Sequence, residues 1–419
     1  MTTYRTGALL AATALAGLLA APPAAYAEGI ARPAGLDGSG ECTFPMKKQI
    51  AGIPWSLQRV LLDELWQGGK GKGVRVAVID TGVDDVNPQL KEAVDAKSGK
   101  DYLKPDKENP GPGDEKRGKT DGTEDQVGHG TKVAGIIAAR AVDGTGFVGL
   151  APEATIIPIR QNDEKNSGKS DTMAQAIDYA VLKGADVINI SQDTTQPLGP
   201  ESAMAKAVAR AIAANVVVVA SAGNDGVDGK DKNTYPAAFP GVLAVASSDR
   251  DNERAAFSQS GPFVGVAAPG VDIVSTVPGG GQCVDNGTSF SAPYVSGVAA
   301  LLRAKHKDWT AAQIVTRIEQ TAVRSVNDRD RHVGWGVVDP VRALADGADD
   351  TAPPSSPTPD PGPPRPPAPE PAHMAMSETP QERSERLATY ALGIGAVLVA
   401  VVAGAAAVIR DSRRRRPAR

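Results

Sequence analysis

The sequence is poor in cysteine, in histidine and in net charge. Its 419 residues include two cysteines and four histidines, and the formal net charge is −4. Two cysteines allow at most one disulfide within the chain, so the fold cannot depend on a network of cross-links. The small charge gives no sign of nucleic acid as a partner. No internal repeat is visible. No run of spaced oxygen ligands is visible either, so we assign no metal ion, and we assign no cofactor.

An apolar segment stands near the start of the chain. Residues 1–27 combine Arg5, an apolar core and the small-residue motif AYA, which is the pattern of a secretory signal peptide. An uncleaved anchor helix is the alternative, but Pro22 and Pro23 end the apolar run below the ~20 residues that span a bilayer. We expect the mature chain to begin near Glu28.

A second apolar segment, residues 387–409, is uncharged and is followed by a basic tail at 410–419. This combination is typical of a transmembrane helix with a basic stop. A buried core helix is the alternative, although no domain remains for it to pack against. Because the positive-inside rule places the arginines in the cytoplasm, we expect a single-pass protein of the cell membrane with an extracytoplasmic main domain. No LPxTG-like motif precedes the run, which disfavours attachment to a cell wall.

An exported domain would place both cysteines in an oxidising compartment. In an oxidising compartment a pair of cysteines is more often joined than free. We therefore expect a disulfide between Cys42 and Cys283, with two unpaired thiols as the alternative. It would hold an N-terminal arm, residues 28–54, beside the segment that leads to Ser289. Closing so long a loop contributes about 4 kcal/mol in the chain-entropy model.

Residues 55–347 alternate short apolar runs with alanine-rich stretches, and a proline-rich linker at 348–386 follows them. This alternation predicts an α/β domain with a parallel sheet covered by helices. A long charged loop at 95–127 interrupts the pattern. The expected strands are Val74–Ile79, Thr155–Ile159, Val187–Ile190, Val216–Ala220, Leu243–Ala246 and Val264–Ala267. The expected helices are Ser56–Trp66, Gly130–Ala139, Thr172–Lys183, Glu201–Ala214, Ser289–Lys305 and Thr310–Thr321.

Four polar residues stand at the ends of these elements, where open α/β folds place their sites. Asp80 ends the strand VAVID, and His129 starts a helix between two glycines. Ser289 starts another helix, and Asn224 follows the strand VVVVA. Each has an ordinary structural explanation when taken singly: a turn residue, a surface histidine, a helix N-cap and a loop amide, respectively.

Together the four residues supply what a serine nucleophile needs. The hydroxyl needs a base, here His129, and the base needs a carboxylate to orient it, here Asp80. The charge that develops on a carbonyl oxygen needs donors, which the backbone N–H of Ser289 and the side chain of Asn224 would provide. The set indicates nucleophilic catalysis by serine.

The order Asp, His, Asn, Ser, in the segments VIDTGV, GHGTKVAGIIA, SAGNDG and NGTSFSAP, resembles the subtilisin family over about residues 55–345. The resemblance implies a subtilisin-like three-layer α/β/α sandwich with a mostly parallel central sheet. It also implies peptide-bond hydrolysis through an acyl-enzyme by Asp80, His129 and Ser289, with Asn224 in the oxyanion hole. The signal peptide, the arm with PWSLQ, the linker and the C-terminal apolar segment are similar to those of the mycosins, the subtilases associated with type VII secretion in actinobacteria.

The resemblance further implies that Ser191, Gln192, Asp193 and Gly223 bind substrate. Subtilases usually carry Ser-Leu-Gly where this chain has Ser-Gln-Asp, so a carboxylate replaces a glycine in the substrate channel. We expect either a preference for small or basic substrate residues or slow general proteolysis; a surface-pointing Asp193 without a role is the alternative. Residues 28–48 are too few for an independently folding inhibitory propeptide, so we expect maturation without loss of a large prodomain.

Three functions fit these observations. The first is a membrane-anchored endopeptidase that cleaves exported proteins at a type VII secretion machine, and the complete triad favours it. The second is a structural subunit that stabilises the secretion complex regardless of catalysis. The third is a degradative surface protease with broad specificity. The expected partners are a protein or peptide substrate, the membrane and the type VII secretion membrane complex.

Overall fold

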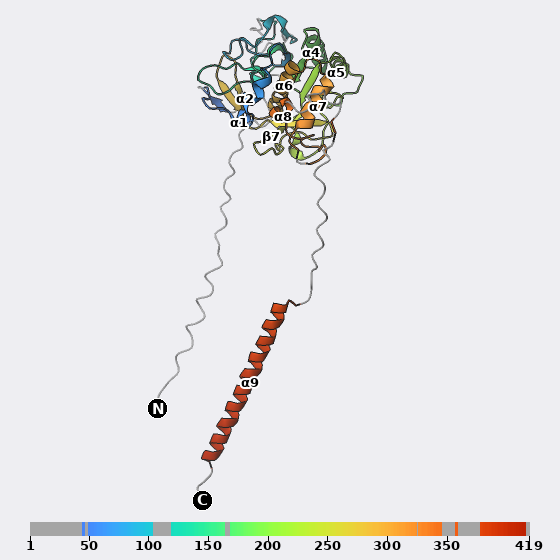
Figure 1. Ribbon diagram of the computed structural model, residues 1–419. Coiled ribbons are helices and arrows are strands. Elements are labelled where there is room, and N and C mark those ends of the chain that lie inside the picture. Colours follow the sequence, from blue (N-terminus) through green and yellow to red (C-terminus); the bar gives the residue numbers. More distant parts are fainter. Residues whose placement is uncertain are drawn as a thin grey trace, which may run out of the picture. The chain divides into compact units, whose positions relative to one another are not determined.

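This computed structural model describes residues 44–46, 49–103, 119–163, 168–324, 326–345, 357–358 and 378–415. The chain divides into two units, residues 1–361 and 362–419, each of which we describe by itself (Figure 1). The expected signal peptide, Cys42, the middle of the charged loop, nearly all of the linker and the end of the basic tail lie outside the described residues.

Seven parallel strands form the central sheet of the first unit, in the order β3-β4-β2-β5-β6-β7-β8. The six expected strands are all present, shifted by at most two residues at either end. Their bounds, with that of the additional edge strand β3, are β2 Arg75–Asp80, β3 Lys100–Asp101, β4 Thr155–Arg160, β5 Val187–Ile190, β6 Val217–Ser221, β7 Leu243–Ser248 and β8 Val264–Pro269.

Helices cover both faces of this sheet. The α-helices are α1 Trp55–Gln58, α2 Leu62–Leu65, α3 His129–Ala138, α4 Ser170–Leu182, α5 Ala203–Ala213, α6 Thr288–Lys305, α7 Ala311–Thr321 and α8 Pro340–Leu344. Short 3-10 helices are η1 Trp66–Gly68, η2 Ala96–Ser98 and η4 Gly226–Asp228. Thr310, the first residue of the last expected helix, is the N-cap of α7 and accepts a hydrogen bond from Gln313 N at 3.2 Å.

Alternate residues of strand β2 show the three layers. Val76 and Val78 pack in one apolar core with α3 and α6, whereas Ala77 and Ile79 pack in a second core with α4 and α5. Successive side chains of a strand point to opposite faces, and a sheet buried on both faces therefore needs continuous apolar runs. Figure 1 shows α4 and α5 next to each other and α6 in the middle of the domain. The predicted α/β/α sandwich is confirmed.

The expected helix Ser56–Trp66 is wrong. The backbone leaves the helical conformation at Leu61, where ψ is 88°, and two short helices, α1 and α2, replace one long helix. The bend has a packing reason, because Leu57, Val60 and Leu65 all reach the core, with at most 4% of each side chain exposed. A straight helix places residues 60 and 65 about 140° apart, wider than an apolar stripe of about 100°, so it would not point all three inward.

A small antiparallel sheet attaches the arm to the domain. Its strands are β1 Phe44–Met46, β10 Gln282–Asp285 and β9 Ile273–Thr276, in the order β1-β10-β9. Pro45 of the arm lies opposite Cys283 in this sheet. In the described part of the chain, Cys283 is not a free thiol. Because Cys42 lies outside the described residues, its pairing with Cys283 stays a prediction.

Helix α9, Pro380–Arg414, belongs to the second unit and contains the apolar run 387–409. It is the one helix in the described part of the chain that is long and apolar enough to cross a membrane, and an 18-residue stretch of it has a mean hydropathy of 2.6. Thr379 caps it, accepting from Glu382 N at 3.2 Å. At 1.5 Å per residue the apolar run is about 34 Å long, which matches the hydrocarbon core of a bilayer.

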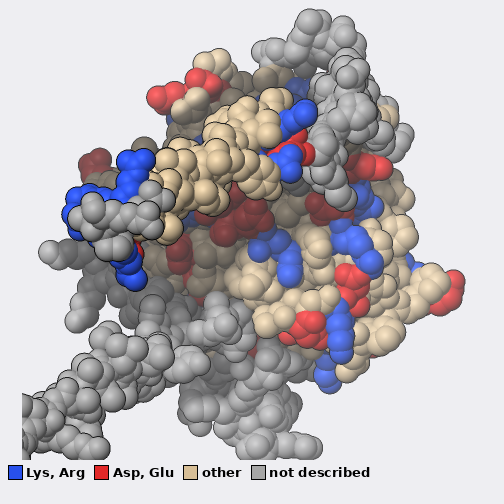
Figure 2. All heavy atoms as spheres, turned by 90° about the horizontal axis from the view of Figure 1, so that it is seen from below, with Lys and Arg blue, Asp and Glu red and all other residues tan. Residues whose placement is uncertain are grey.

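Charges of both signs are distributed over the face seen in Figure 2, where blue Lys and Arg side chains alternate with red Asp and Glu side chains. The described residues also form exposed ion pairs, such as Arg210 with Asp178 at 2.7 Å. Such pairs contribute about 1 kcal/mol or less to stability. On this face we therefore see an ordinary solvated surface rather than a patch of one sign.

Candidate active site

Asp80 and His129 meet at the carboxyl edge of the sheet. Asp80 is the last residue of β2 and is completely buried, and His129 is the first residue of α3 with 6% of its surface exposed. The distance between His129 Nδ1 and Asp80 Oδ1 is 2.7 Å, and Thr81 N donates to the same oxygen at 2.8 Å. With Nδ1 held by the carboxylate, Nε2 of the imidazole is left as the proton acceptor.

Asp125, which the sequence analysis did not identify, fixes the start of α3. Its carboxylate accepts from Gly128 N at 2.7 Å, from Thr131 N at 2.8 Å and from the hydroxyl of Thr81 at 2.8 Å. These backbone N–H groups belong to the first turn of the helix and have no partner within it. Asp125 thereby holds His129 at a defined position. A carboxylate four residues ahead of the helix was the available sequence signal.

The charges around His129 set its basicity. Burial disfavours the charged imidazolium, but the adjacent Asp80 carboxylate outweighs burial and raises the pKa of His129 above its ordinary value of 6.5. The ammonium group of Lys132, one turn along α3, acts in the opposite direction. The imidazole of His129 is therefore mostly neutral only above this raised pKa.

Lys132 also ties α3 to the small sheet. Its Nζ lies 2.7 Å from Asp285 Oδ2 on β10, and the two side chains are 2% and 3% exposed. The same ammonium lies 5.4 Å from the centre of the Phe290 ring, at the start of α6. The Lys132 side chain thus links helix α3, which begins at His129, to strand β10 and to the surroundings of Ser289.

Ser289 is the second residue of α6, and 6% of its surface is exposed. Its hydroxyl donates to the backbone carbonyl of Ser191 at 3.1 Å, and the hydroxyl of Ser191 donates to the Ser289 carbonyl at 2.9 Å. The hydroxyl of Ser289 therefore points to Ser191 in this rotamer. The imidazole of His129 is close by, since its centre lies 5.5 Å from the ring centre of the adjacent Phe290. Rotation about χ1 to another staggered position redirects the hydroxyl.

Asn224 is held in a fixed orientation by Thr288, a second residue that the sequence analysis missed. The oxygen Oδ1 of Asn224 accepts from Thr288 N at 2.9 Å and from the Thr288 hydroxyl at 3.0 Å. Because the oxygen accepts both of these hydrogen bonds, the NH₂ group of Asn224 remains available as a donor beside the start of α6. The arrangement suits an oxyanion donor, because the amide is positioned before any charge develops.

The four expected substrate-binding residues come from the two segments that follow β5 and β6. Ser191 is buried and contacts Ser289, as described above. Gln192 and Asp193 line a pocket of about 380 Å³. Gly223 has a φ of 101°, and a Cβ placed on it would lie 3.0 Å from Asp193 Oδ2. The structure therefore brings Asp193 and Gly223 together, with the carboxylate turned toward the second segment.

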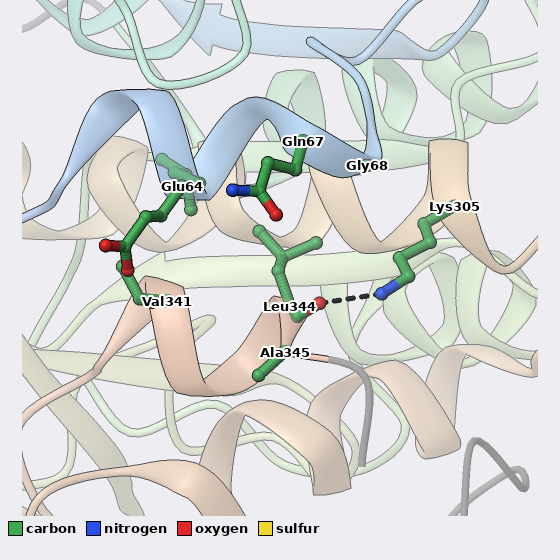
Figure 3. Close-up of a pocket in the computed structure, with 8 residues that line it drawn as sticks. Glu64, Gln67, Gly68, Lys305, Val341, Leu344 and Ala345 are labelled. Atoms are coloured by element: carbon green, nitrogen blue, oxygen red, sulfur yellow. Dashed lines mark hydrogen bonds between the residues drawn. The ribbon is translucent and has the colours of Figure 1, made fainter.

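A separate pocket of about 560 Å³ lies between η1 and α8 (Figure 3). Lys305, the last residue of α6, donates there to the backbone carbonyl of Leu344 at 2.7 Å. Lys305 stands sixteen residues after Ser289 on the same helix. At 1.5 Å per residue the two are about 24 Å apart, so this pocket is not part of the site around Ser289.

The chain is similar to proteins of known family. The model of the subtilase family matches residues 71–336. Subtilisin E of Bacillus subtilis (strain 168) is 37% identical over 272 residues, which are 64% of this chain and 66% of that protein. Subtilisin of Bacillus pumilus is 36% identical over 272 residues, covering 64% of this chain and 91% of that protein.

Solved structures agree with this result. The structure of the MycP3 protease from the type VII (ESX-3) secretion system matches 72% of this chain and 92% of its own, with 33% identity and a TM-score of 0.62. MycP1 from Mycobacterium smegmatis matches 75% of this chain and 90% of its own, with 31% identity and a TM-score of 0.63. From its sequence match, its fold and its site, the chain belongs to the subtilase family of serine proteases.

Proposed function

We propose that this protein is a membrane-anchored serine endopeptidase that processes exported proteins at a type VII secretion system, with Asp80, His129 and Ser289 as its catalytic triad. The observation that carries the proposal is the 2.7 Å contact between His129 Nδ1 and Asp80 Oδ1 beside the start of α6, where Ser289 stands. It gives a buried serine an oriented base. Family membership and the contacts of Asn224 support the same reaction.

The reaction follows from this geometry. Ser289 Oγ attacks the carbonyl carbon of a peptide bond, and its proton passes to His129 Nε2 while Asp80 stabilises the imidazolium. The backbone N–H of Ser289 and the NH₂ of Asn224 bind the oxyanion. The C–N bond then breaks, and His129 returns the proton to the leaving amine. Water, deprotonated by His129, attacks the ester and releases the acid, which restores the Ser289 hydroxyl.

Replacing Asn224 with alanine is expected to lower kcat by about 10²–10³-fold with little change in KM. The amide is hydrogen-bonded through its oxygen to Thr288, so its loss removes a donor that acts mainly in the transition state. Steady-state hydrolysis of a fluorogenic peptide measures both constants. A mainly raised KM would show instead that Asn224 binds the ground state. Asn252→Ala, on an exposed turn, is the control and leaves both constants within twofold.

The acid limb of the pH profile of kcat/KM is expected above pH 6.5. His129 must be neutral to accept the serine proton, and its pKa is raised by Asp80 against the effect of burial. The value of kcat/KM for an uncharged peptide should therefore fall as the pH drops through this raised pKa. Rates at substrate concentrations well below KM, from pH 5 to 9, measure the limb. An inflection clearly below pH 6.5 would contradict the raised pKa of His129.

The membrane and secretion parts of the proposal have separate support. Helix α9 is long and apolar enough to span a bilayer. Solved structures at 31–33% identity are described as proteases of type VII secretion systems. A structural subunit of the secretion complex and a broad surface protease are the alternatives. The buried contacts between Asp80, His129 and the start of α6 favour an enzyme over a scaffold.

A comparison of Ser289→Ala with deletion of the whole chain, in the cell that produces it, tests this role. Exported proteins are collected, and their termini are determined by mass spectrometry. The proposal predicts that Ser289→Ala abolishes specific cleavages while export continues. Loss of export in the deletion alone, with all termini unchanged in Ser289→Ala, supports the structural subunit. Widespread cleavage of unrelated exported proteins, lost in Ser289→Ala, supports the broad surface protease.

A further inference from the structure

Two carboxylates flank Gly223 beside the nucleophile. Asp193 stands two residues after Ser191, whose carbonyl accepts the hydrogen bond of the Ser289 hydroxyl at 3.1 Å. Asp225 follows Asn224 directly and is exposed. A Cβ on Gly223 would lie 3.0 Å from Asp193 Oδ2, so the carboxylate faces the segment that carries the oxyanion amide. Negative charge is therefore concentrated where a substrate residue must pass.

The Asp193 carboxylate has no hydrogen-bond donor and no cation paired with it in the described part of the chain. Lys169 lines the same pocket of about 380 Å³ without pairing with it, and the other ionisable group that acts on Asp193 is Asp225. Asp193 is an exposed residue, although protein atoms crowd its carboxylate. This crowding, with the repulsion from Asp225, raises the pKa of Asp193 to about 6. An anion in this situation is stabilised by a cation that the protein itself does not supply.

We infer that Asp193, assisted by Asp225, selects a lysine or arginine side chain on the acyl side of the cleaved bond. The inference rests on the proposed function. When a carbonyl lies between Ser289 and Asn224, the side chain of the same residue extends between the two segments that follow β5 and β6. Those segments carry Asp193 and Asp225. A long side chain with an apolar stem can lie along the side-chain-free Gly223 and place its charge at the carboxylates.

A preference for small residues is the competing interpretation, since Asp193 fills space that a glycine would leave open. The two interpretations differ in the effect of charge at constant size. Lysine and norleucine have side chains of similar length, and only lysine carries a charge. Alanine reports the effect of size alone.

The test uses the full-length chain in detergent micelles and three fluorogenic peptides that differ in this one residue: lysine, norleucine or alanine. We expect kcat/KM at pH 8 to be at least about tenfold higher for lysine than for norleucine. The ratio should fall toward one between pH 7 and 5, because Asp193 is charged above its pKa of about 6 and neutral below it. Titration of His129 affects both peptides alike and cancels in the ratio.

Asp193→Asn is expected to reduce the lysine-to-norleucine ratio to near one at every pH, and Asp193→Gly provides a second variant in case the first does not fold. Asp251→Asn, which removes an exposed carboxylate on a turn, should keep the full ratio. A ratio near one at pH 8, a ratio that survives in Asp193→Asn, or alanine exceeding lysine would each overturn the inference. Cleavage of none of the three peptides contradicts the proposed function instead.

Discussion

Replacing Ser289 with alanine is expected to lower kcat for a peptide substrate by roughly 10⁶-fold, the size known for the same change in subtilisin. The alanine leaves His129 and Asp80 in place, with their 2.7 Å contact, but removes the atom that forms the ester. What remains is binding and the stabilisation of the oxyanion, which together accelerate hydrolysis by about 10³–10⁴-fold over the reaction in water. Hydrolysis of a fluorogenic peptide by the full-length chain measures the loss.

Ser291→Ala is the matched control, because Ser291 lies two residues further along α6. Its hydroxyl is 2.8 Å from that of Ser247, within the core, and has no contact with His129. We expect less than a tenfold loss of activity. Equal losses in the two variants would mean that the helix, rather than the hydroxyl of Ser289, supports the reaction.

Replacing Lys132 with methionine is expected to destabilise the protein by about 3–5 kcal/mol. The change leaves the Asp285 carboxylate buried, 3% exposed, without the ammonium that lies 2.7 Å away in the intact chain. For a domain of this size we expect the apparent Tm to fall by roughly 6–20 °C, which thermal unfolding in detergent measures. Because Lys132 lowers the pKa of His129, the surviving activity should also have its acid limb at higher pH.

The exposed pair of Arg210 and Asp178 provides the control, since its side chains are 56% and 44% exposed. Arg210→Met should cost about 1 kcal/mol or less. The double variant Lys132→Met with Asp285→Asn should recover part of the lost stability, because the buried carboxylate is then removed together with the ammonium that faces it. A Tm for Lys132→Met equal to that of Arg210→Met would show that the buried pair does not tie α3 to β10.

The positions of the four candidate residues followed from the sequence because each one ends a strongly patterned element. The strand VAVID is apolar without interruption until Asp80, and its last residue in the structure is Asp80. Buried strands need this pattern, so their ends are easy to locate. The same pattern located the ends of β5 and β6, from which Asp193 and Asn224 follow.

Residues that act through long-range contacts were not predictable in this way. Strand β1 has three residues, and its partner β10 lies more than two hundred residues further along the chain, so no local pattern marks the pairing. Asp125 lies in a loop and acts by accepting from the first turn of α3. The prediction of one helix at 56–66 was wrong for a related reason, because core packing of Val60 and Leu65 outweighed the local preference for a helix. Tertiary contacts decide these features.

Labelling with a fluorophosphonate tests the central claim most directly, because the reagent forms an adduct only with a serine that a base has activated. The full-length chain in detergent is treated at pH 8, digested and mapped by mass spectrometry. The proposed triad predicts one adduct per chain, on Ser289, which is lost in His129→Ala. No adduct on the folded chain, or labelling that persists when Ser289 is replaced by alanine, would contradict it.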